Sequence, residues 1–544
     1  MKSNNFFKNN FIYIFFFIYF LIGIYIIGDY GISIDEEFQR YSGFYWLNYI
    51  LEFTQLEVLK TEVLFRLNDI SGHTLPNPEN FPFYGVTFDL PMAFLETILD
   101  IKDSRNFFLL RHYATFLIFF TSSIFFYLIL KNRFYNNKII ILGLLLYITS
   151  PRIFGDSFYN NKDIVFLSLV TINVYFFFKI VDTLNFKNLA YLSIFSAIAC
   201  STRIVGIFIP LSFLFFLFLS KVNSKKSLLE ILKIIIFFSF LFFFFFFFFW
   251  PYLWSDPFLN LIYSFKIFSE YPANFKMLFN GQYIDSRFLP LSYVPVWIAI
   301  TTPFITLLLS IFGYLLLSKR VFVRTVNIRE QKIHNDFWRG DNEKKDFFIF
   351  FNFTLIFFYI ILANSDLYNG WRHLYFLHIF MIYFACIAIY RFQIKIISKK
   401  FYFLILFVLV ISNFYKIYKY HPFQGSYFNN YVINKKNFEA DYWGLAGVQF
   451  ISDIIGRNPN ISKINIGVAS YIPLERSLRM LKRNIAEKIN IIGQDYENSD
   501  YIFNNNTSEV DKKKNNKYNI PKNFKLISEF YIEDLIIYQI YKKN

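Results

Sequence analysis

The chain has 544 residues, 55% hydrophobic and 23% aromatic, with a formal net charge of +16. A soluble enzyme of this composition would expose enough apolar surface to aggregate, so the composition indicates a polytopic α-helical membrane protein. The basic residues lie mainly in loops between apolar segments, so no nucleic-acid partner is predicted. The two cysteines, Cys200 and Cys386, lie in apolar segments, and the histidines lack metal-binding spacing, so neither a disulfide framework nor a cysteine-based metal site is expected.

About eleven segments are apolar enough for spanning helices, since a helix that crosses a bilayer needs about 20 apolar residues. They are predicted near 10–28, 109–130, 139–151, 163–180, 188–203, 204–220, 229–250, 291–318, 347–364, 373–390 and 401–417. The pair between 188 and 220 is short for two helices, and so is the segment 139–151. The first segment is not followed by a small-residue cleavage site, so it is predicted to be a retained anchor.

Basic residues are concentrated at the N-terminus and in the loops 131–138, 221–226, 319–346 and 391–400. The predicted spans place all of them on one side of the membrane, and the positive-inside rule assigns that side to the cytoplasm. We therefore expect a multi-pass protein of the bacterial inner (plasma) membrane, with its N-terminus in the cytoplasm and its C-terminal part outside.

The first outer loop, residues 29–108, begins with the acids Asp35, Glu36 and Glu37. The segment that follows, FQRYSGFYWLNYILEFTQLEVL, has apolar residues at helical spacing, which predicts amphipathic helix on the membrane surface. Acids at this point have two interpretations that the sequence leaves open. They are either the N-cap of that helix, where they favour the helix dipole, or functional carboxylates.

The stretch SPRIFGDSFYNNKDIVF, residues 150–166, places Arg152, Asp156, Lys162 and Asp163 on a short outer connector between apolar segments. Asp163 has an ordinary explanation as a residue in the first turn of the next helix. The other three have none, and charged groups at membrane depth usually mark a functional site.

Three further outer segments combine charged and aromatic residues. Arg203 lies between two apolar runs, Asp256 follows the aromatic residues of WPYLWSDPF, and Arg372 and His373 lie in YNGWRHLYF. Singly, the arginines could snorkel and the tryptophans could anchor the interface. Yet short outer connectors should be poor in arginine, and arginine suits a phosphate head group. Carboxylates and arginines on one face predict a transferase that uses a polyprenyl-phosphate donor.

Residues 418–544 lose the continuous apolar character of residues 1–417, the predicted transmembrane domain. We expect them to form a small extracytoplasmic α/β domain. KINIGV and LIIYQIY are typical of strands, and GVQFISDII and LERSLRMLKR of helices. The segment 504–520, rich in Asn and Lys, is predicted to be a flexible loop.

In chain order, these motifs resemble the GT-C membrane glycosyltransferases. IDEE resembles the Asp-Glu motif of the first outer loop in that superfamily. PRIFGDSFYNNKD, STRIVG, WPYLWSDP, YNGWRHLYF and YHPFQGSYFN resemble bacterial members related to the protein O-mannosyltransferases (glycosyltransferase family 39), and, more distantly, the aminoarabinose transferase of lipid A. DYWGLAG, residues 441–447, resembles a segment after the last span of these relatives, for which a packing role is favoured. The resemblance covers residues 30–450 and rests on the order of motifs that are individually weak.

The resemblance implies a sugar donor linked to polyprenyl phosphate, with the sugar facing outside, and a protein, lipid or glycan acceptor. It implies that Asp35 is the general base on the acceptor hydroxyl, with Glu36 beside it. The second-loop acid would be Asp163 or else Asp156. Metal use varies in the superfamily, so a divalent cation (Mg²⁺ or Mn²⁺), held by Asp35 and Asp163 if present, is left open. The implied residues for the donor phosphate are Arg203 and Arg372, with His373, Arg152 and Lys162 as further candidates.

Three other classes of protein remain alternatives. They are an oligosaccharide ligase that uses a pyrophosphate-linked donor, a membrane transporter, and a non-catalytic assembly factor. A transporter is disfavoured because the acids gather at one face rather than at the bilayer midplane, and because no inverted repeat is found.

Overall fold

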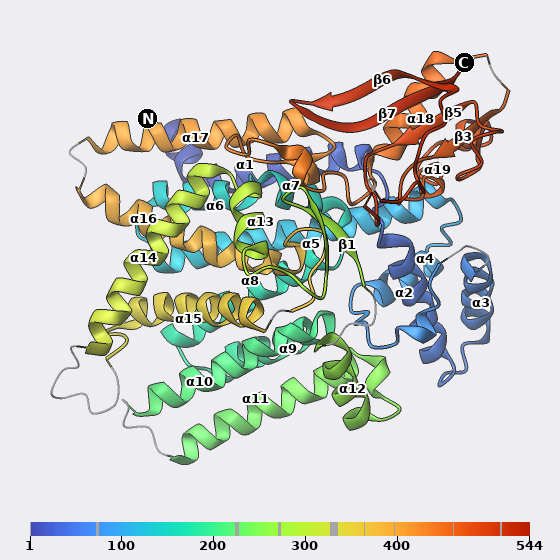
Figure 1. Cartoon of the computed structure of the whole chain (residues 1–544). Helices are drawn as coiled ribbons and strands as arrows, with labels where there is room; N and C mark the ends of the chain where they lie inside the picture. The colour runs from blue at the N-terminus through green and yellow to red at the C-terminus, as the bar shows by residue number, and fades with distance from the viewer. Residues whose placement is uncertain are drawn as a thin grey trace.

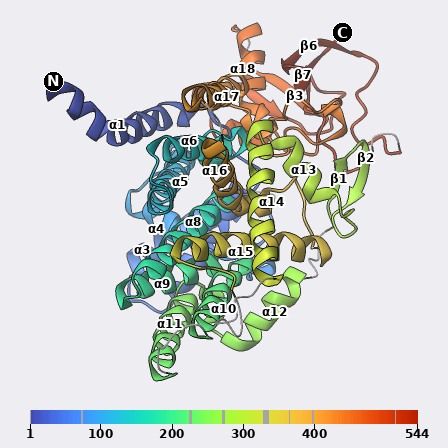
Figure 2. The same ribbon diagram turned by 90° about the vertical axis from the view of Figure 1, so that its left-hand side faces the viewer.

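The computed structural model describes residues 2–71, 75–222, 228–269, 274–326, 336–363, 365–395, 398–460, 462–511 and 514–544. Long helices lie side by side through most of the molecule, and a sheet region covers one corner of the bundle (Figure 1). The N-terminal helix projects from the bundle when the molecule is turned by 90° (Figure 2).

The elements used below have the following bounds. The helices are α1 (Lys2–Ile26), α2 (Glu36–Leu51), α3 (Glu57–Ser71), α4 (Asp89–Ile98), α5 (Ser104–Arg133), α6 (Asn137–Ile148), α7 (Pro151–Tyr159), α8 (Asp163–Asp182), α9 (Phe186–Thr202), α10 (Phe208–Val222), α11 (Leu228–Phe248), α12 (Pro257–Ser269), α13 (Tyr293–Thr301), α14 (Phe304–Val326), α15 (Asp341–Leu362), α16 (His378–Lys395), α17 (Lys399–Tyr420), α18 (Ala446–Arg457), α19 (Glu475–Leu478) and α20 (Arg483–Ala486), with the short 3-10 helices η3 (Ile204–Ile207), η4 (Pro251–Leu253) and η5 (Arg372–Leu377). The strands are β1 (Lys276–Phe279), β2 (Gln282–Asp285), β3 (Ile464–Val468), β4 (Ile489–Ile491), β5 (Tyr501–Asn504), β6 (Phe524–Ile532) and β7 (Leu535–Lys543).

Eight helices in the described part of the chain are long and apolar enough to cross a membrane. A ninth is obtained if α6 and α7, which are bent by 59° at their junction, count as one span. The predicted segments coincide with helices, and the segment 291–318 is divided between α13 and α14. Three of the helices, α6 with 12 residues, α10 with 15 and α9 with 17, are shorter than the eight candidate spans. The protein is therefore a multi-pass helical membrane protein, and the predicted count of about eleven spans exceeds what helix length alone supports.

The prediction that residues 151–163 form a connector is wrong for most of that stretch, because residues 151–159 form the helix α7. Pro151 occupies its first turn, where the missing N–H costs no hydrogen bond. All nine residues of α7 are buried, so the charged side chains of this stretch lie inside the protein rather than on an exposed loop.

The predicted surface helix after Asp35 is present as two helices, α2 and α3, separated by a turn. Figure 1 places α2–α4, α12 and the C-terminal sheet toward one end of the long helices. The N-terminus, the last turn of α14 and the first turn of α15 lie toward the other end. Residues 223–227, 327–335 and 396–397 of the predicted basic loops lie outside the described residues, and the helix ends beside these gaps lie toward that second end.

A buried carboxylate holds four helices together at the basic end. Asp346 in α15 accepts hydrogen bonds from Arg133 of α5 (2.8 Å), from Arg320 of α14 (2.9 Å) and from the Tyr383 hydroxyl of α16 (2.6 Å). A charge that is fully paired in this way avoids the high cost of an uncompensated charge in a low-dielectric interior. This end of the bundle is therefore fixed by charge pairing as well as by apolar packing.

The C-terminal region contains a five-stranded sheet in the order β4-β3-β5-β7-β6. Strand β3 runs parallel to β4 and β5, whereas β7 is antiparallel to β5 and β6. The strands predicted at KINIGV and LIIYQIY are confirmed as β3 and β7, and the helix predicted at GVQFISDII as α18. LERSLRMLKR forms only short helical turns, α19 and the start of α20.

One set of contacts joins this region to the helix α17, and another joins two segments within the region. The turn between β6 and β7 carries Glu533, whose carboxylate accepts from Lys416 (2.5 Å) and from the Tyr420 hydroxyl (3.0 Å) of α17. In the predicted flexible segment, Asn505 is buried and its side chain donates to Asp441 (3.3 Å), so the start of that segment is ordered; residues 512–513 lie outside the described chain.

Candidate active site

Asp35 lies at the N-cap position of α2, but its side chain makes no capping hydrogen bond. Instead, Arg372 Nη1 donates to Asp35 Oδ2 at 2.5 Å. The carboxylate is 35% exposed, so it remains accessible from outside the protein. The geometry therefore favours a functional carboxylate over a capping role for Asp35.

The side chain of Arg372, in the first turn of η5, packs against two aromatic rings. Its guanidinium carbon lies 4.9 Å from the ring centroid of Tyr368 and 4.8 Å from that of Trp443. The side chain is 4% exposed, and Nη1 is also 3.9 Å from Asp163 Oδ2. Because a guanidinium stacks well on aromatic faces, these rings fix the direction in which Arg372 points.

The segment DYWGLAG supplies one of these rings. Asp441 accepts from the backbone N–H of Leu445 (3.1 Å) and of Ala446 (3.2 Å), which caps the start of α18. Gly444 has φ +74°, a backbone conformation that a residue without Cβ adopts freely. The turn built in this way places Trp443 against Arg372, so the segment has a packing role that reaches the site.

Asp163 begins α8 and is 2% exposed. It forms an ion pair with Arg203, which follows the last turn of α9. Asn160 orients it from both sides, because its Oδ1 accepts from the Asp163 N–H (2.9 Å) and its Nδ2 donates to Asp163 Oδ2 (3.0 Å). The sequence placed Asp35, Asp163, Arg203 and Arg372 on one side of the membrane, and the structure brings their side chains into one chain of contacts.

The electrostatics of the site follow from these contacts. Burial acts to raise the pKa of Asp35, but the charge and hydrogen bond of Arg372, helped by Lys162 and Arg203, bring that pKa below its ordinary value. Burial, together with the charge of Arg203, lowers the pKa of Lys162 to about 8. Asp35 is therefore ionised at neutral pH. The pKa of Lys162, about 8, lies close to neutral pH.

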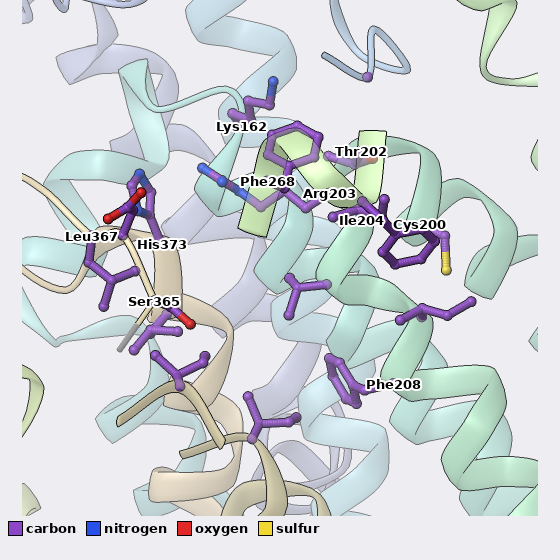
Figure 3. Close-up of a pocket in the computed structure, with 18 of the residues that line it drawn as sticks. Lys162, Cys200, Thr202, Arg203, Ile204, Phe208, Phe268, Ser365, Leu367 and His373 are labelled. Carbon is purple, nitrogen blue, oxygen red and sulfur yellow. The ribbon is translucent and has the colours of Figure 1, made fainter. Parts of the chain in front are cut away.

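A cavity of about 620 Å³ lies next to this cluster. Lys162, Arg203 and His373 lie toward one end of it and Phe208 toward the other (Figure 3). Phe265, Ile356, Tyr359 and Ile360 add to the apolar part of the wall. The cavity thus has the cations Lys162 and Arg203 at one end, and the rest of its wall is largely apolar but includes Asp366 and Ser365.

The apolar part of the cavity reaches the lipid-facing surface of the bundle. Leu355 and Tyr359 of α15 line the cavity and are nevertheless 48% and 64% exposed on a candidate span. Phe265 of α12, also in the wall, is 42% exposed. Exposed apolar residues of both α12 and α15 therefore contribute to the cavity wall.

Of the predicted site residues, Lys162, Arg203 and His373 lie in the cavity wall and the others lie outside it. Glu36 is 1% exposed, with its Oε2 2.9 Å from His112 Nε2. Asp156 accepts from the Tyr159 hydroxyl at 2.7 Å. Arg152 is 1% exposed, and its Nε donates to the Tyr427 carbonyl at 2.9 Å. Their proposed roles in catalysis and phosphate binding stay predictions.

Sequence reasoning missed Asp89, which the structure places next to Lys162. Asp89 Oδ1 accepts from Arg111 (3.3 Å) and from Asn161 (3.2 Å), and burial raises the pKa of Asp89 to about 6. Its neighbours in the sequence, FDLPMAF, have the pattern of an ordinary helix start, so no local signal distinguishes Asp89 from a first-turn acid. Tyr84, whose ring lies 4.2 Å from Lys162 Nζ, was also missed, because no local sequence pattern distinguishes it from other aromatic residues.

A divalent cation does not fit the residues at hand. Within the described chain, no three His, Cys, Asp or Glu side chains come together as a metal-binding group. The two acids proposed as ligands, Asp35 and Asp163, are each bound to an arginine, whose charge occupies the place of a cation. The divalent cation stays a prediction, and the proposed reaction includes no step on a metal ion.

Comparison with known protein families finds a similarity over part of the chain. The family model described as dolichyl-phosphate-mannose-protein mannosyltransferase matches residues 93–250, less than a third of the chain. The matched part runs from α4 to α11 and includes Asp163, Lys162 and Arg203. No curated protein matches the chain. Over these residues the chain is similar to a family described as mannosyltransferases.

Proposed function

We propose that the protein transfers a hexose- or pentose-type sugar from a polyprenyl-phosphate donor to an acceptor hydroxyl at the outer face of the membrane. One observation carries this proposal. A partly exposed carboxylate, Asp35, is linked through Arg372 and Asp163 to the arginine that forms the cationic end of a lipid-accessible cavity. A base and a phosphate site are thereby held side by side.

The proposed donor pose follows from the cavity. The phosphate lies at the end formed by Lys162, Arg203 and His373, and the polyprenyl chain follows the apolar wall toward the gap between α12 and α15. Lysine and arginine bind phosphate oxygens through charge-assisted hydrogen bonds, and arginine can do so with two parallel bonds. The cationic end would also stabilise the negative charge that grows on the phosphate as the sugar leaves.

The proposed reaction has one bond forming and one breaking. The acceptor oxygen attacks the anomeric carbon of the sugar while the bond from that carbon to the phosphate oxygen breaks and its electron pair leaves with the phosphate. Asp35 takes the proton of the acceptor hydroxyl. Arg372 keeps Asp35 ionised and fixes its direction, so the base is ready before the acceptor arrives.

The alternatives fit the same observations less well. A pyrophosphate-linked donor would need room for a second phosphate, and only one end of the described cavity is cationic. A transporter would place its charges along a path across the membrane, whereas Asp35, Asp163, Arg203 and Arg372 gather at one end of the bundle. A non-catalytic assembly factor has no need for the cavity.

The test is radiolabel transfer from polyprenyl-phosphate sugars in membranes that contain wild-type protein or Asp35→Asn. A general base contributes about 10²–10⁴-fold, so transfer by the variant should fall by at least about 100-fold. Asp29→Asn is the matched control, because Asp29 is an exposed acid six residues earlier that contacts His421 instead of an arginine. Equal transfer by wild type and Asp35→Asn would move the base elsewhere, and no transfer from any such donor would reject the proposed class.

A further inference from the structure

The C-terminal domain packs directly on the loop that carries Asp35. The Ile34 N–H donates to the Trp443 carbonyl at 3.0 Å, and Arg479 Nη1 lies 3.1 Å from Glu37 Oε1. Met480, just after α19, packs in one apolar cluster with Ile32. Residues more than four hundred positions apart in the sequence therefore build one wall of the site.

Arg476 of α19 lies in this wall without a hydrogen-bond partner. It is 6% exposed, and its Nε and Nη1 atoms are buried with no acceptor among the described residues. Among the charges that act on it, those of Glu37 and Asp35 have the largest effects. Buried donors are nearly always satisfied in native proteins, so an unsatisfied guanidinium this close to a candidate base calls for an explanation.

The neighbouring acids do not provide that explanation, because each has another partner. Asp35 is bound to Arg372 at 2.5 Å, Glu37 lies 3.1 Å from Arg479, and Glu36 contacts His112. Among the described residues of this cluster, Arg476 is thus the cation that no carboxylate contacts. The donor phosphate does not explain it either, since Arg476 is absent from the wall of the donor cavity.

We propose that Arg476 binds an anionic group of the acceptor, a phosphate or a carboxylate close to the hydroxyl that is glycosylated. This proposal rests on the proposed function, because it assigns the acceptor side of the same site. Arginine is suited to it, since a guanidinium presents paired N–H donors to the oxygens of either anion. The exposed fraction of Asp35 (35%) and of Tyr471 (41%) leaves this side of the site open to an acceptor.

Binding of an anion here would also change the base. A negative charge beside Asp35 opposes the effect of Arg372 and raises the pKa of that carboxyl, which strengthens its conjugate base. An acceptor without the anion would meet a weaker base. The same contact would therefore select the acceptor and activate the attack.

The experiment measures binding, not turnover, on the full chain purified in detergent. Glycerol 3-phosphate, glycerate and glycerol are titrated by calorimetry, because each has hydroxyls and they differ in the anion. The Lys162→Gln background weakens the donor-phosphate end and leaves the Arg203–Asp163 ion pair intact, so the remaining binding reports mainly the acceptor side. Arg476→Gln is the test variant, and Arg483→Gln is its control, since Arg483 is a nearby arginine that is 91% exposed.

We expect Arg476→Gln to weaken binding of the anionic probe by about 10- to 100-fold, the range for hydrogen bonds to a charged group. Loss for glycerol 3-phosphate alone would assign a phosphate, loss for glycerate alone would assign a carboxylate, and loss for both would assign either anion. Binding of glycerol and the behaviour of Arg483→Gln should not change. Unchanged anion affinity in Arg476→Gln, or no anion binding by the parent protein, would overturn the proposal.

A second variant covers a failure of Arg476→Gln to fold. Arg476→Lys keeps the charge but cannot present paired donors, so its anion affinity should fall severalfold, whereas parental affinity would overturn the proposal. The outcome is separable from the proposed function. Anion binding that depends on Arg476, in a protein that transfers no sugar, would keep this site and reject the glycosyltransferase.

Discussion

Asp163→Asn removes one negative charge from the centre of the proposed site and almost nothing else. The amide has the shape of the carboxylate and can still contact Asn160. The change removes the ion pair with Arg203 and the attraction of Arg372, whose Nη1 lies 3.9 Å away. Asp163 is 2% exposed, so water does not replace the lost charge.

The size of the effect can be worked from these contacts. At 3.9 Å and an effective dielectric constant of about 20, two unit charges attract by about 4 kcal/mol. Removal of one partner from a buried ion pair typically costs about 3–5 kcal/mol, because the other charge is left uncompensated. Both estimates predict that Asp163→Asn destabilises the protein by about 4 kcal/mol.

The assay is unfolding in mixed detergent micelles, followed by tryptophan fluorescence. Asp256→Asn is the matched control, because Asp256 also lies at a helix start, where it accepts from the Leu259 N–H (3.1 Å) and its role needs no charge. The double variant Asp163→Asn with Arg203→Gln should recover part of the loss, since it leaves fewer unpaired charges. Equal stability of Asp163→Asn and Asp256→Asn would refute the claim that this cluster is held together by charge.

Two further predictions concern the cavity. A Cβ on Gly85 would lie 1.6 Å from the Ser201 carbonyl oxygen, so Gly85→Ala should lower the free energy of unfolding by about 1–3 kcal/mol. Gly28→Ala is the control, because a Cβ on Gly28 meets nothing within 4 Å. Equal melting temperatures of the two variants would contradict this prediction. The pKa of Lys162 is about 8, so its ammonium group loses its charge as the pH rises through that value. The affinity of the wild-type protein for polyprenyl phosphate should therefore fall above pH 8. The affinity of Lys162→Gln should show no such step. A step that persists in the variant would assign it to another group.

Hydropathy was enough to place most of the long helices and to select four residues that the structure brings together in the candidate site. Interruptions of apolar segments mark helix ends, and ionisable groups at such ends stand out against a lipid background, which is how Asp35, Asp163, Arg203 and Arg372 were found. The bend between α6 and α7 was not predicted, because a buried helix rich in polar residues resembles a loop when only hydropathy is considered.

The partners of these residues could not be predicted. The contact between Arg372 and Asp35 joins residues 337 positions apart, and no local pattern encodes such a pairing. Arg476 lies in a segment whose composition is that of an ordinary surface helix, and Asp89 has the position of a routine first-turn acid. Each acquires its significance from the fold, which brings it against a group from another part of the chain.

The docking of the C-terminal domain on the Asp35 loop has a consequence for biosynthesis. Asp35 is made early, whereas Trp443 and Arg476 are added only after most of the membrane helices have been synthesised. During that interval the nascent chain has Asp35 but neither the Trp443 ring that packs on Arg372 nor the arginine, Arg479, that pairs with Glu37. The surroundings of Asp35 are therefore completed only after the C-terminal region has been synthesised and has folded onto the loop.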